Sequence, residues 1–454
     1  MAEVKKAGYF NIDSFKIMSY DGSKEVDIKM LIYAFNIYES MDRGSIRGTV
    51  ELHETAGIIH DFPILGEEYL EITYTDFFDV QRTEMYFIYA ITDVRPPAPS
   101  SQGMWNYKLH FTSVPKVFTE KYQLKRAFVD RLISDMANEV FDEFFIRNTG
   151  FDYIGNVPLK QIFVQPTESL QRLVIPNYTP EQTMHFFARK AWSGDTRASF
   201  SNTFSFFETR NQYYFCTNEW LRDFEQSYTP EYTHNFDFDN TPEGQIEAMS
   251  NIIKYEYQQP INSIESINKG GYFRKAVEID MLHGTFDNTE YMFHTEFPNN
   301  NPGQNLRHSD TFINERLERE YEKWIMRDYT PEGAAGGYAV RPPTKYAFIY
   351  NTKHSHKFHT DQNRMSLTVY GSNEVFVGQK VKLEFVKRQG FSDADVDWRR
   401  DDERSGEYLI ESINNVFIGD VYTQDMIVTK NGGLFEQFNE PRPLSRIGGI
   451  PTVQ

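Results

Sequence analysis

The chain has 454 residues, a formal net charge of -18 at pH 7 and an aromatic content of 16%. This length exceeds what one hydrophobic core usually holds and predicts about three domains. The acidic balance argues against free affinity for DNA or for an anionic membrane, since either would need clustered Lys and Arg. The aromatic content favours a β-rich chain with large contact surfaces.

The sequence gives no sign of export or of membrane insertion. Its single cysteine, Cys216, cannot form an intramolecular disulfide, which fits folding in a reducing cytoplasm. The N-terminal stretch MAEVKKAGYFNIDSF lacks the apolar core of a signal peptide, and no apolar run is long enough to cross a membrane. We therefore expect a soluble protein without a membrane anchor.

Alternation of polar and apolar residues predicts strands in the first third of the chain. Residues 28–53 give two strands around the turn Ser-Met-Asp-Arg-Gly, where Gly44 is expected to adopt a positive φ. Further strands are expected at 68–77, 85–94 and 109–113. Residues 95–103, rich in Pro and Ser, should form a surface loop between the last two.

The period of the pattern changes near residue 116, where apolar residues begin to recur every four positions. They predict an amphipathic helix and comprise Leu124, Phe128, Leu132, Met136, Val140 and Phe144. A second helix is expected from Thr179, with Pro180 in its first turn and Gln182 completing a capping box. Thr-Pro-Glu also begins at 229, 241 and 330, and we interpret each occurrence as a helix start or a turn.

Strand patterns return after about residue 250, in IIKYEYQQPINSI, KAVEIDML, RMSLTVYGS, VGQKVKLEFV and EYLIESINNV. A polar insert, 294–338, interrupts them, with a helix expected from Asn314 to Arg327. A second polar stretch, 388–406, precedes the final hairpin.

The last hairpin repeats an earlier one. MYFIYAITDV (85–94) aligns with EYLIESINNV (407–416), and LHFTS (109–113), which follows the first, aligns with MIVTK (426–430), which follows the second. Upstream, LGEEYLEITY (65–74) resembles VGQKVKLEFV (377–386), whereas residues 28–53 have no recognisable second copy. The repeat therefore indicates two related domains rather than a solenoid.

These patterns predict four segments. They are a first β domain at 1–115, an α/β middle domain at 116–245, a second β domain at 246–440 with an inserted segment at about 286–345, and a tail at 441–454.

Motifs of catalysis are absent from the sequence. It contains no P-loop, nucleophile elbow, His-Glu-x-x-His or Cys-x-x-Cys. Cys216 alternates with aromatic residues and is interpreted as a buried packing residue. His354, His356, His359 and Asp361 have possible ligand spacing, but a polar strand face or loop explains them better than a metal. We predict no catalytic, cofactor or metal site, and no enzyme activity.

Several segments resemble the central baseplate hub protein of contractile-tailed bacteriophages, and the hub part of type VI secretion spike proteins. They are GYFNIDSFKIMSYDG, SMDRGSIRGTVELHE, YTPEQTMHFFARKAW, IKYEYQQPINSIESINKGGYFRKAVEIDM and SGEYLIESINNVFIGDVYTQDMIVTKNG, spread over about residues 8–432. The resemblance implies a β-rich α+β fold, with two tube-like antiparallel β-barrel domains in one chain and an intervening α/β segment.

The resemblance also implies a function. Three chains would form a ring of six similar domains that adapts a six-fold tail tube to a three-fold spike. The partners implied are the homotrimer, the tail tube protein, the central spike protein and other baseplate or wedge proteins, with DNA passing the channel without specific binding. The location implied is the virion tail baseplate, assembled in the host cytoplasm.

The repeated hairpin is our candidate for the contact between subunits, because its strands are long, aromatic and poor in edge-protecting Lys and Pro. The candidate interface residues are Tyr86, Ile88, Ile91, Tyr408, Ile410 and Ile413.

The same composition is compatible with two other classes of protein. A carbohydrate- or receptor-binding β protein would stack sugars on exposed Trp and Tyr, but the five Trp residues are scattered. A hydrolase with two carboxylates has no positive signal. Oligomeric state separates the hub from both, since neither alternative requires three chains.

Overall fold

The computed structural model describes the chain in several ranges. They are residues 5–54, 62, 64–95, 105–147, 159–168, 170–193, 203–223, 228–234, 241–257, 268, 273–280, 284–292, 322–326, 329–332, 337–340, 351, 353, 364–389, 397–401 and 404–430. The predicted surface loop at 95–103 and the tail at 441–454 lie almost wholly outside them, as does the His run at 354–361.

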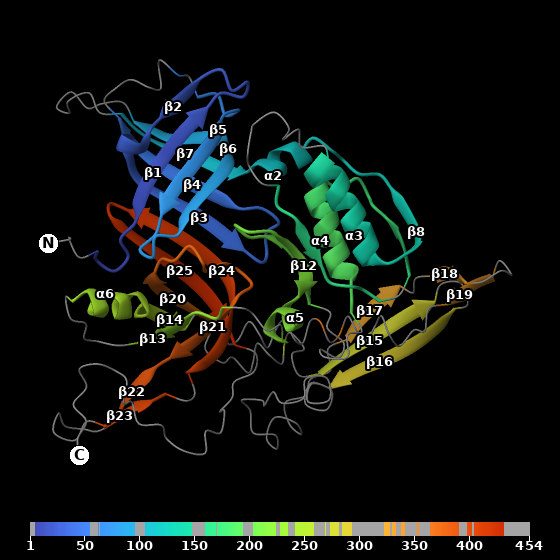
Figure 1. Cartoon of the computed structure of the whole chain (residues 1–454). Helices are drawn as coiled ribbons and strands as arrows, with labels where there is room; N and C mark the ends of the chain where they lie inside the picture. Colours follow the sequence, from blue (N-terminus) through green and yellow to red (C-terminus); the bar gives the residue numbers. More distant parts are fainter. Residues whose placement is uncertain are drawn as a thin grey trace.

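One large, mainly antiparallel sheet of 13 strands joins the first quarter of the chain to its second half (Figure 1). The strands from the first third are β1 (Asn11–Met18), β2 (Glu25–Asp27), β3 (Ile32–Ser40), β4 (Arg47–Glu54), β5 (Tyr69–Thr75), β6 (Gln81–Arg95) and β7 (Trp105–Ser113). Those from the remainder are β13 (Glu231–Thr233), β14 (Ile252–Tyr257), β20 (Arg364–Tyr370), β21 (Lys380–Glu384), β24 (Gly406–Ile418) and β25 (Val421–Thr429). The fold is therefore β-rich, as predicted.

The predicted hairpin in residues 28–53 is confirmed as β3 and β4, but the reason for its glycine is different. Gly44 is not among the residues with a positive φ. A Cβ at this position would instead lie 2.7 Å from the ring of Phe206 and 2.8 Å from Cγ of Glu181. Glycine is needed here because the turn packs tightly against the middle of the chain.

The two repeated hairpins have the same ladder. β6 pairs with β7 with a bulge between Ile88 and Ala90. β24 pairs with β25 with a bulge between Ile410 and Ser412. Ile88 and Ile410 are matched in the sequence alignment, and their bulges coincide, so the predicted register is confirmed as far as Thr92 and Asn414. Beyond them it is wrong, because a second bulge in β6, between Thr92 and Arg95, places Arg95 rather than Val94 at the position of Val416. β5 and β21, the strands of the upstream resemblance, pair with the first halves of β6 and β24.

The structure also contains the second copy of residues 28–53 that the sequence does not reveal. β14 and β20 form a pair with a bulge between Ile252 and Lys254, as β3 and β4 do between Ile32 and Ala34. The insert separates β14 from β20 in the sequence, which hides the match. The strand order β3-β4-β7-β6-β5 thus recurs as β14-β20-β25-β24-β21.

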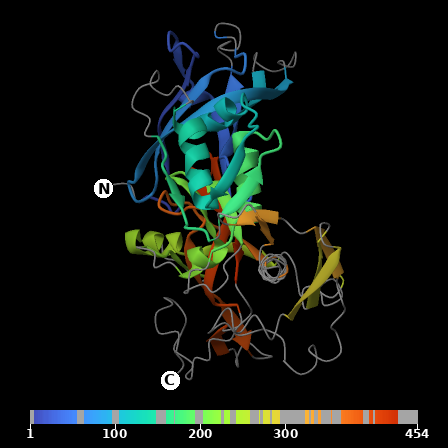
Figure 2. The same ribbon diagram turned by 90° about the vertical axis from the view of Figure 1, so that its right-hand side faces the viewer.

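The middle of the chain packs its helices α2, α3 and α4 on the side of the first repeat, whereas α6 lies beside strands of the second (Figure 1 and Figure 2). Its elements are α2 (Val114–Thr119), β8 (Ala127–Arg131), α3 (Ile133–Phe141), the π-helix η2 (Asp142–Arg147), β9 (Ile162–Val164), β10 (Gln171–Val174), α4 (Pro180–Lys190), β11 (Phe204–Glu208), β12 (Tyr213–Thr217), α5 (Asn218–Asp223) and α6 (Pro242–Met249); the short 3-10 helix η1 (Lys29–Leu31) belongs to the first repeat. The capping box of α4 is confirmed, because Thr179 accepts from the N–H of Gln182 and the Gln182 side chain accepts from that of Thr179.

One helix prediction and two of the Thr-Pro-Glu predictions are wrong here. The amphipathic helix predicted to include Leu124 and Phe128 begins only at Ile133, because residues 127–131 form β8 and pair with β10. Leu124 and Phe128 nevertheless enter the same core as the later members of the pattern. Of the Thr-Pro-Glu sequences, Thr179 and Thr241 cap helices, whereas those at 229 and 330 lead into or lie within strands.

The rest of the described chain forms small separate sheets. Their strands are β15 (Phe273–Asp280), β16 (Thr285–Met292), β17 (Glu322–Met326), β18 (Tyr329–Glu332), β19 (Gly337–Val340), β22 (Val386–Gln389) and β23 (Asp397–Arg400). The helix predicted from Asn314 to Arg327 is wrong at 322–326, where the backbone pairs with β15 as a parallel strand. Pairing to an existing strand overrides local helical preference here.

Candidate functional site at the junction of the two repeats

The two repeats are joined edge to edge by one pair of strands. The second half of β24 pairs antiparallel with β3, from Ser412 opposite Ser40 to Ile418 opposite Ala34. Phe417 of β24 stacks on Phe35 of β3, with ring centroids 4.1 Å apart and planes at 6°. A residue of the second repeat thus completes the core of the first, so the junction is a packed interior rather than a loose hinge.

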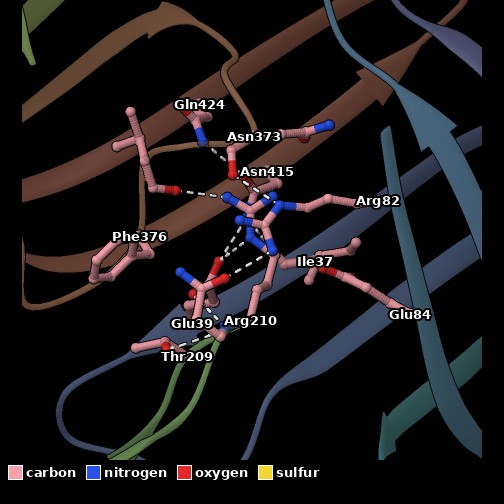
Figure 3. A network of polar contacts seen from close by, with 12 residues as sticks. Ile37, Glu39, Arg82, Glu84, Thr209, Arg210, Asn373, Phe376, Asn415 and Gln424 are labelled. Atoms are coloured by element: carbon pink, nitrogen blue, oxygen red, sulfur yellow. Dashed lines mark hydrogen bonds and ion pairs between the residues drawn. The ribbon is translucent and has the colours of Figure 1, made fainter. Parts of the chain in front are cut away.

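A fully buried ion pair lies behind this strand pair (Figure 3). The side chains of Glu39 on β3 and of Arg210 are 0% exposed, and Arg210 Nε lies 2.8 Å from Glu39 Oε1. The backbone N–H of Arg210 donates to the second carboxylate oxygen at 3.2 Å. A buried charge of this kind requires partners on all sides, because its desolvation is costly.

Polar side chains of the second repeat supply some of these partners. Asn415 Nδ2 donates to Glu39 Oε1 at 3.3 Å and to the Ile37 carbonyl at 3.2 Å. The Asn415 carbonyl oxygen in turn accepts from the Tyr422 hydroxyl at 2.8 Å and from Gln424 Nε2 at 2.9 Å. A connected network therefore runs from β3 through β24 to β25.

Arg210 comes from the middle of the chain, at the turn between β11 and β12. Its Nη1 donates to the Tyr74 hydroxyl of the first repeat at 3.0 Å, and its Nη2 to the Val375 carbonyl of the second at 2.6 Å. Nearby, Glu208 accepts from the backbone N–H of Ile46 at 3.0 Å. The β11–β12 hairpin thus fixes both repeats to the middle segment as well as to each other.

The charge state of this site is set by its surroundings. Burial alone would lower the pKa of Arg210, but attraction from Tyr422, Tyr74 and Glu39 outweighs it and raises the pKa well above its usual value. Burial raises the pKa of Tyr422 to about 12, so its hydroxyl keeps its proton and donates. The site is therefore built to hold a fixed geometry over the physiological pH range.

Most of the predicted interface residues lie in the chain's own cores. Tyr86, Ile88, Tyr408, Ile410 and Ile413 are buried, and Ile91 is partly buried against the first core. The N–H groups of Ile88 and Ile410 donate to Glu68 and Gln379 carbonyls, at 2.8 and 3.0 Å. Contact of these six residues with another subunit stays a prediction, and the structure shows that they also hold each repeat together.

The face of the sheet that points away from these cores is polar across both repeats. Two of its cations stand beside carboxylates: Lys108 Nζ lies 2.6 Å from Glu51, and Arg364 is paired with Glu411. Thr368 donates to Asp425 at 2.6 Å. Part of the positive charge on this face is therefore paired with carboxylates.

Cys216 and two of the Trp residues named in the sequence analysis pack against other side chains in the structure. Cys216 is fully buried in β12, as predicted, and burial raises the pKa of its thiol. Trp192 is buried, and Trp220 stacks on Phe163 with centroids 4.4 Å apart. Within the described ranges no group of His, Cys, Asp or Glu is placed to hold a metal ion, and no helix is long and apolar enough to span a membrane.

Sequence reasoning missed both members of the buried ion pair. Glu39 does carry a signal, because it shares the apolar face of its strand with Phe35 and Ile37. A charge on such a face indicates a buried partner. Arg210 carries none, because its burial results from the arrangement of three distant segments.

Comparison with known proteins places this fold. No protein-family model and no curated protein matches the sequence. A tail protein from Neisseria meningitidis MC58 has a similar structure, with a TM-score of 0.50 and 10% identity over 92% of this chain and 97% of that chain. The 43 kDa tail protein of prophage MuSo2 from Shewanella oneidensis gives a TM-score of 0.48 and 11% identity over 92% and 97%.

A type VI secretion component of Escherichia coli, described as structurally similar to the T4 bacteriophage tail proteins gp27 and gp5, gives a TM-score of 0.39 and 10% identity over 96% of this chain and 79% of that chain. The Neisseria tail protein, matched over nearly the whole of both chains, is the structure that carries the comparison. In fold, the chain is therefore similar to a tail protein.

Proposed function

We propose that this protein is the structural baseplate hub of a contractile phage tail. Three chains form a ring that adapts the six-fold tail tube to a three-fold spike and leaves a channel for DNA. One observation carries the proposal: two repeats with the same strand order and with two matching bulges lie side by side in one sheet, joined through β24 and β3.

Duplication has a direct consequence for symmetry. A chain with two similar tube-like β domains, 1–115 and 246–440, offers two similar binding surfaces to a neighbouring protein. The whole chain, in contrast, occurs three times in the ring. Three copies in a closed ring therefore present six similar surfaces on one side and three-fold features elsewhere. A six-fold tube protein and a three-fold spike are the partners that fit these two symmetries, with other baseplate proteins around them.

The junction supports this role because it fixes the angle between the repeats. The Glu39–Arg210 pair and the stacked rings of Phe35 and Phe417 are fully buried, so one repeat cannot rotate freely against the other. A ring that bears the load of tail contraction requires such fixed angles. The middle segment, bound through Arg210 to both repeats, acts as a brace.

The polar face of the sheet is the surface that we assign to the channel. Two of its cations, Lys108 and Arg364, stand beside carboxylates. Pairing of this kind weakens the attraction of these cations for the phosphates of double-stranded DNA, which we expect to pass without being held. Tight binding of DNA by the purified protein at physiological salt would contradict this assignment.

Mass and shape in solution test the proposal. We expect native mass spectrometry at micromolar concentration to show three chains of 53.3 kDa each. Negative-stain images should show a ring with a central hole. A monomer under these conditions, including after addition of the tube and spike proteins, would refute the hub, and a compact particle without a hole would refute the channel.

A further inference from the structure

We propose that a pocket between the first repeat and the middle of the chain binds an acidic side chain on a peptide segment of a partner protein. The pocket has a volume of about 540 Å³ and is formed by the β3–β4 turn, α4, β11 and Lys353. Ligand sites commonly have volumes of about 300–1,000 Å³ and lie where separate parts of a fold meet. The inference concerns one chain and does not depend on the hub assembly.

The walls of the pocket are held in place by their own packing. At Gly44 in the β3–β4 turn, a Cβ would lie 2.7 Å from the Phe206 ring, so the turn is in close contact with β11 at that point. Met41 and Asp42, earlier in the same turn, line the pocket instead. The N–H of Met41 donates to the Glu411 carbonyl at 2.9 Å, and its side chain is buried. The opening is therefore a fixed feature of the fold.

The lining combines apolar side chains with hydrogen-bonding groups that no neighbour uses. Met41, Ala188 and Phe204 line the pocket and are buried. Arg189 and Ser205 also line it, and within the described part of the chain neither side chain has an ion pair or a hydrogen bond. Their donors are available to a ligand.

These donors favour a carboxylate. Arg189 is exposed and carries a positive charge on a chain whose net charge is -18. Gln182, one turn and a half earlier on the same helix, uses its side-chain oxygen in the capping box with Thr179, which leaves its amide N–H groups for a ligand. An ionised acceptor forms stronger hydrogen bonds with such donors than a neutral acceptor does.

The other charged groups of the lining favour one negative charge on the ligand rather than two. Asp42 lines the pocket, and so does the last turn of α4, where the helix dipole is negative. Lys353 Nζ offsets part of that dipole by donating to the Ala188 carbonyl at 2.9 Å. His185 is turned toward Glu181, with its Nε2 3.9 Å from the carboxylate. This balance suits a single carboxylate better than a dianionic phosphate.

A peptide segment supplies the remaining contacts. The Asp42 carboxylate has several acceptor positions and can accept from a backbone N–H of the ligand. The buried apolar side chains of the lining can contact an apolar residue next to the acidic one. The chemistry assigned to the ligand is therefore a Glu or Asp flanked by apolar residues.

Three capped tripeptides test this assignment. They are acetyl-Phe-Glu-Phe-amide and the same peptide with Gln or with Lys in the middle, titrated into the full chain and followed by saturation-transfer NMR. We expect the Glu peptide to bind about fivefold or more tightly than the Gln peptide, because only the carboxylate forms charged hydrogen bonds with Arg189. The Lys peptide should bind most weakly.

A charge reversal locates the site. Arg189→Glu should weaken the Glu peptide and strengthen the Lys peptide, so that the order of affinities is inverted. Arg147→Glu is the matched control, because Arg147 is also exposed in the last turn of a helix and does not line the pocket. This control should keep the order of the wild type. Both variants should keep the wild-type melting temperature, since neither arginine side chain has a partner within the described residues.

Several outcomes would overturn the proposal. They are equal affinities of the Glu and Gln peptides, no binding of the Glu peptide at about 10 mM, and an Arg189→Glu protein with the wild-type order of affinities. Each would leave the pocket as a hollow filled with water. Inorganic phosphate that displaces the Glu peptide at equal concentration would overturn the choice of a carboxylate. A monomeric wild type that binds the Glu peptide as expected would refute the hub and leave this inference standing.

Discussion

Replacement of Arg210 by methionine tests whether the buried ion pair holds the junction. Methionine has a similar length and fits an apolar space, but it cannot bind the Glu39 carboxylate, the Tyr74 hydroxyl or the Val375 carbonyl. Breaking a buried pair by removing one partner typically costs about 3–5 kcal/mol, because the remaining charge stays buried. Since both side chains here are 0% exposed, we expect a loss of about 4 kcal/mol in unfolding free energy.

A double-mutant cycle measures the coupling. Glu39→Gln removes the stranded charge while its amide oxygen can still accept from Asn415, so Arg210→Met/Glu39→Gln should recover about 2 kcal/mol or more relative to the sum of the single changes. Urea unfolding followed by circular dichroism gives the four free energies. If Arg210→Met lowers the free energy of unfolding by less than about 1 kcal/mol, the ion pair is not the main interaction that stabilises the junction.

Two further predictions concern other parts of the fold. Burial alone would raise the pKa of Glu181, but His185 and Lys116 lower it from 4.5 to about 2, so its contribution is present above pH 4.5 and is lost as the pH falls toward 2. The Glu181→Gln variant should therefore have a free energy of unfolding about 3 kcal/mol lower than wild type near neutral pH, and this difference should shrink in acid. A difference that stays constant down to pH 2 would contradict this. A Cβ on Gly48 would lie 2.0 Å from the Phe111 ring. Gly48→Ala should therefore lower the melting temperature and reduce the free energy of unfolding by about 3 kcal/mol. The double variant Gly48→Ala/Phe111→Val should restore part of this loss.

The sequence is a good guide wherever the determinants are local. Ile88 and Ile410 could be aligned because alternation in the two hairpins keeps the same faces in phase, and a strand that slips by one residue exposes its core. The capping box at Thr179 was predictable because its donors and acceptors lie within one turn.

Contacts between residues that are far apart in the sequence could not be predicted. The insert between β14 and β20 hides the second copy of residues 28–53, and a difference in core side-chain sizes hides it further. Gly48 faces Phe111 in the first repeat, whereas Met365 faces Val428 in the second. Each pair fills a similar space, although position by position the residues differ, and core volume rather than identity is what packing preserves. Arg210 gave no signal in the sequence because its site forms only once three distant segments have folded together.

What the repeats share is therefore the backbone, and above all its irregularities. A bulge bends its strand and increases the local twist. The bulges after Ile88 and Ile410, and those after Ile32 and Ile252, give the two repeats two bends at matching places, and β6 has a further bulge between Thr92 and Arg95 that β24 lacks. A ring built from such units needs equal angles at every junction, and these depend on the bends rather than on which side chains fill the core. Substitutions inside either core can thus accumulate in compensating pairs, whereas removal of one bulge would shift the edge that the next unit must meet.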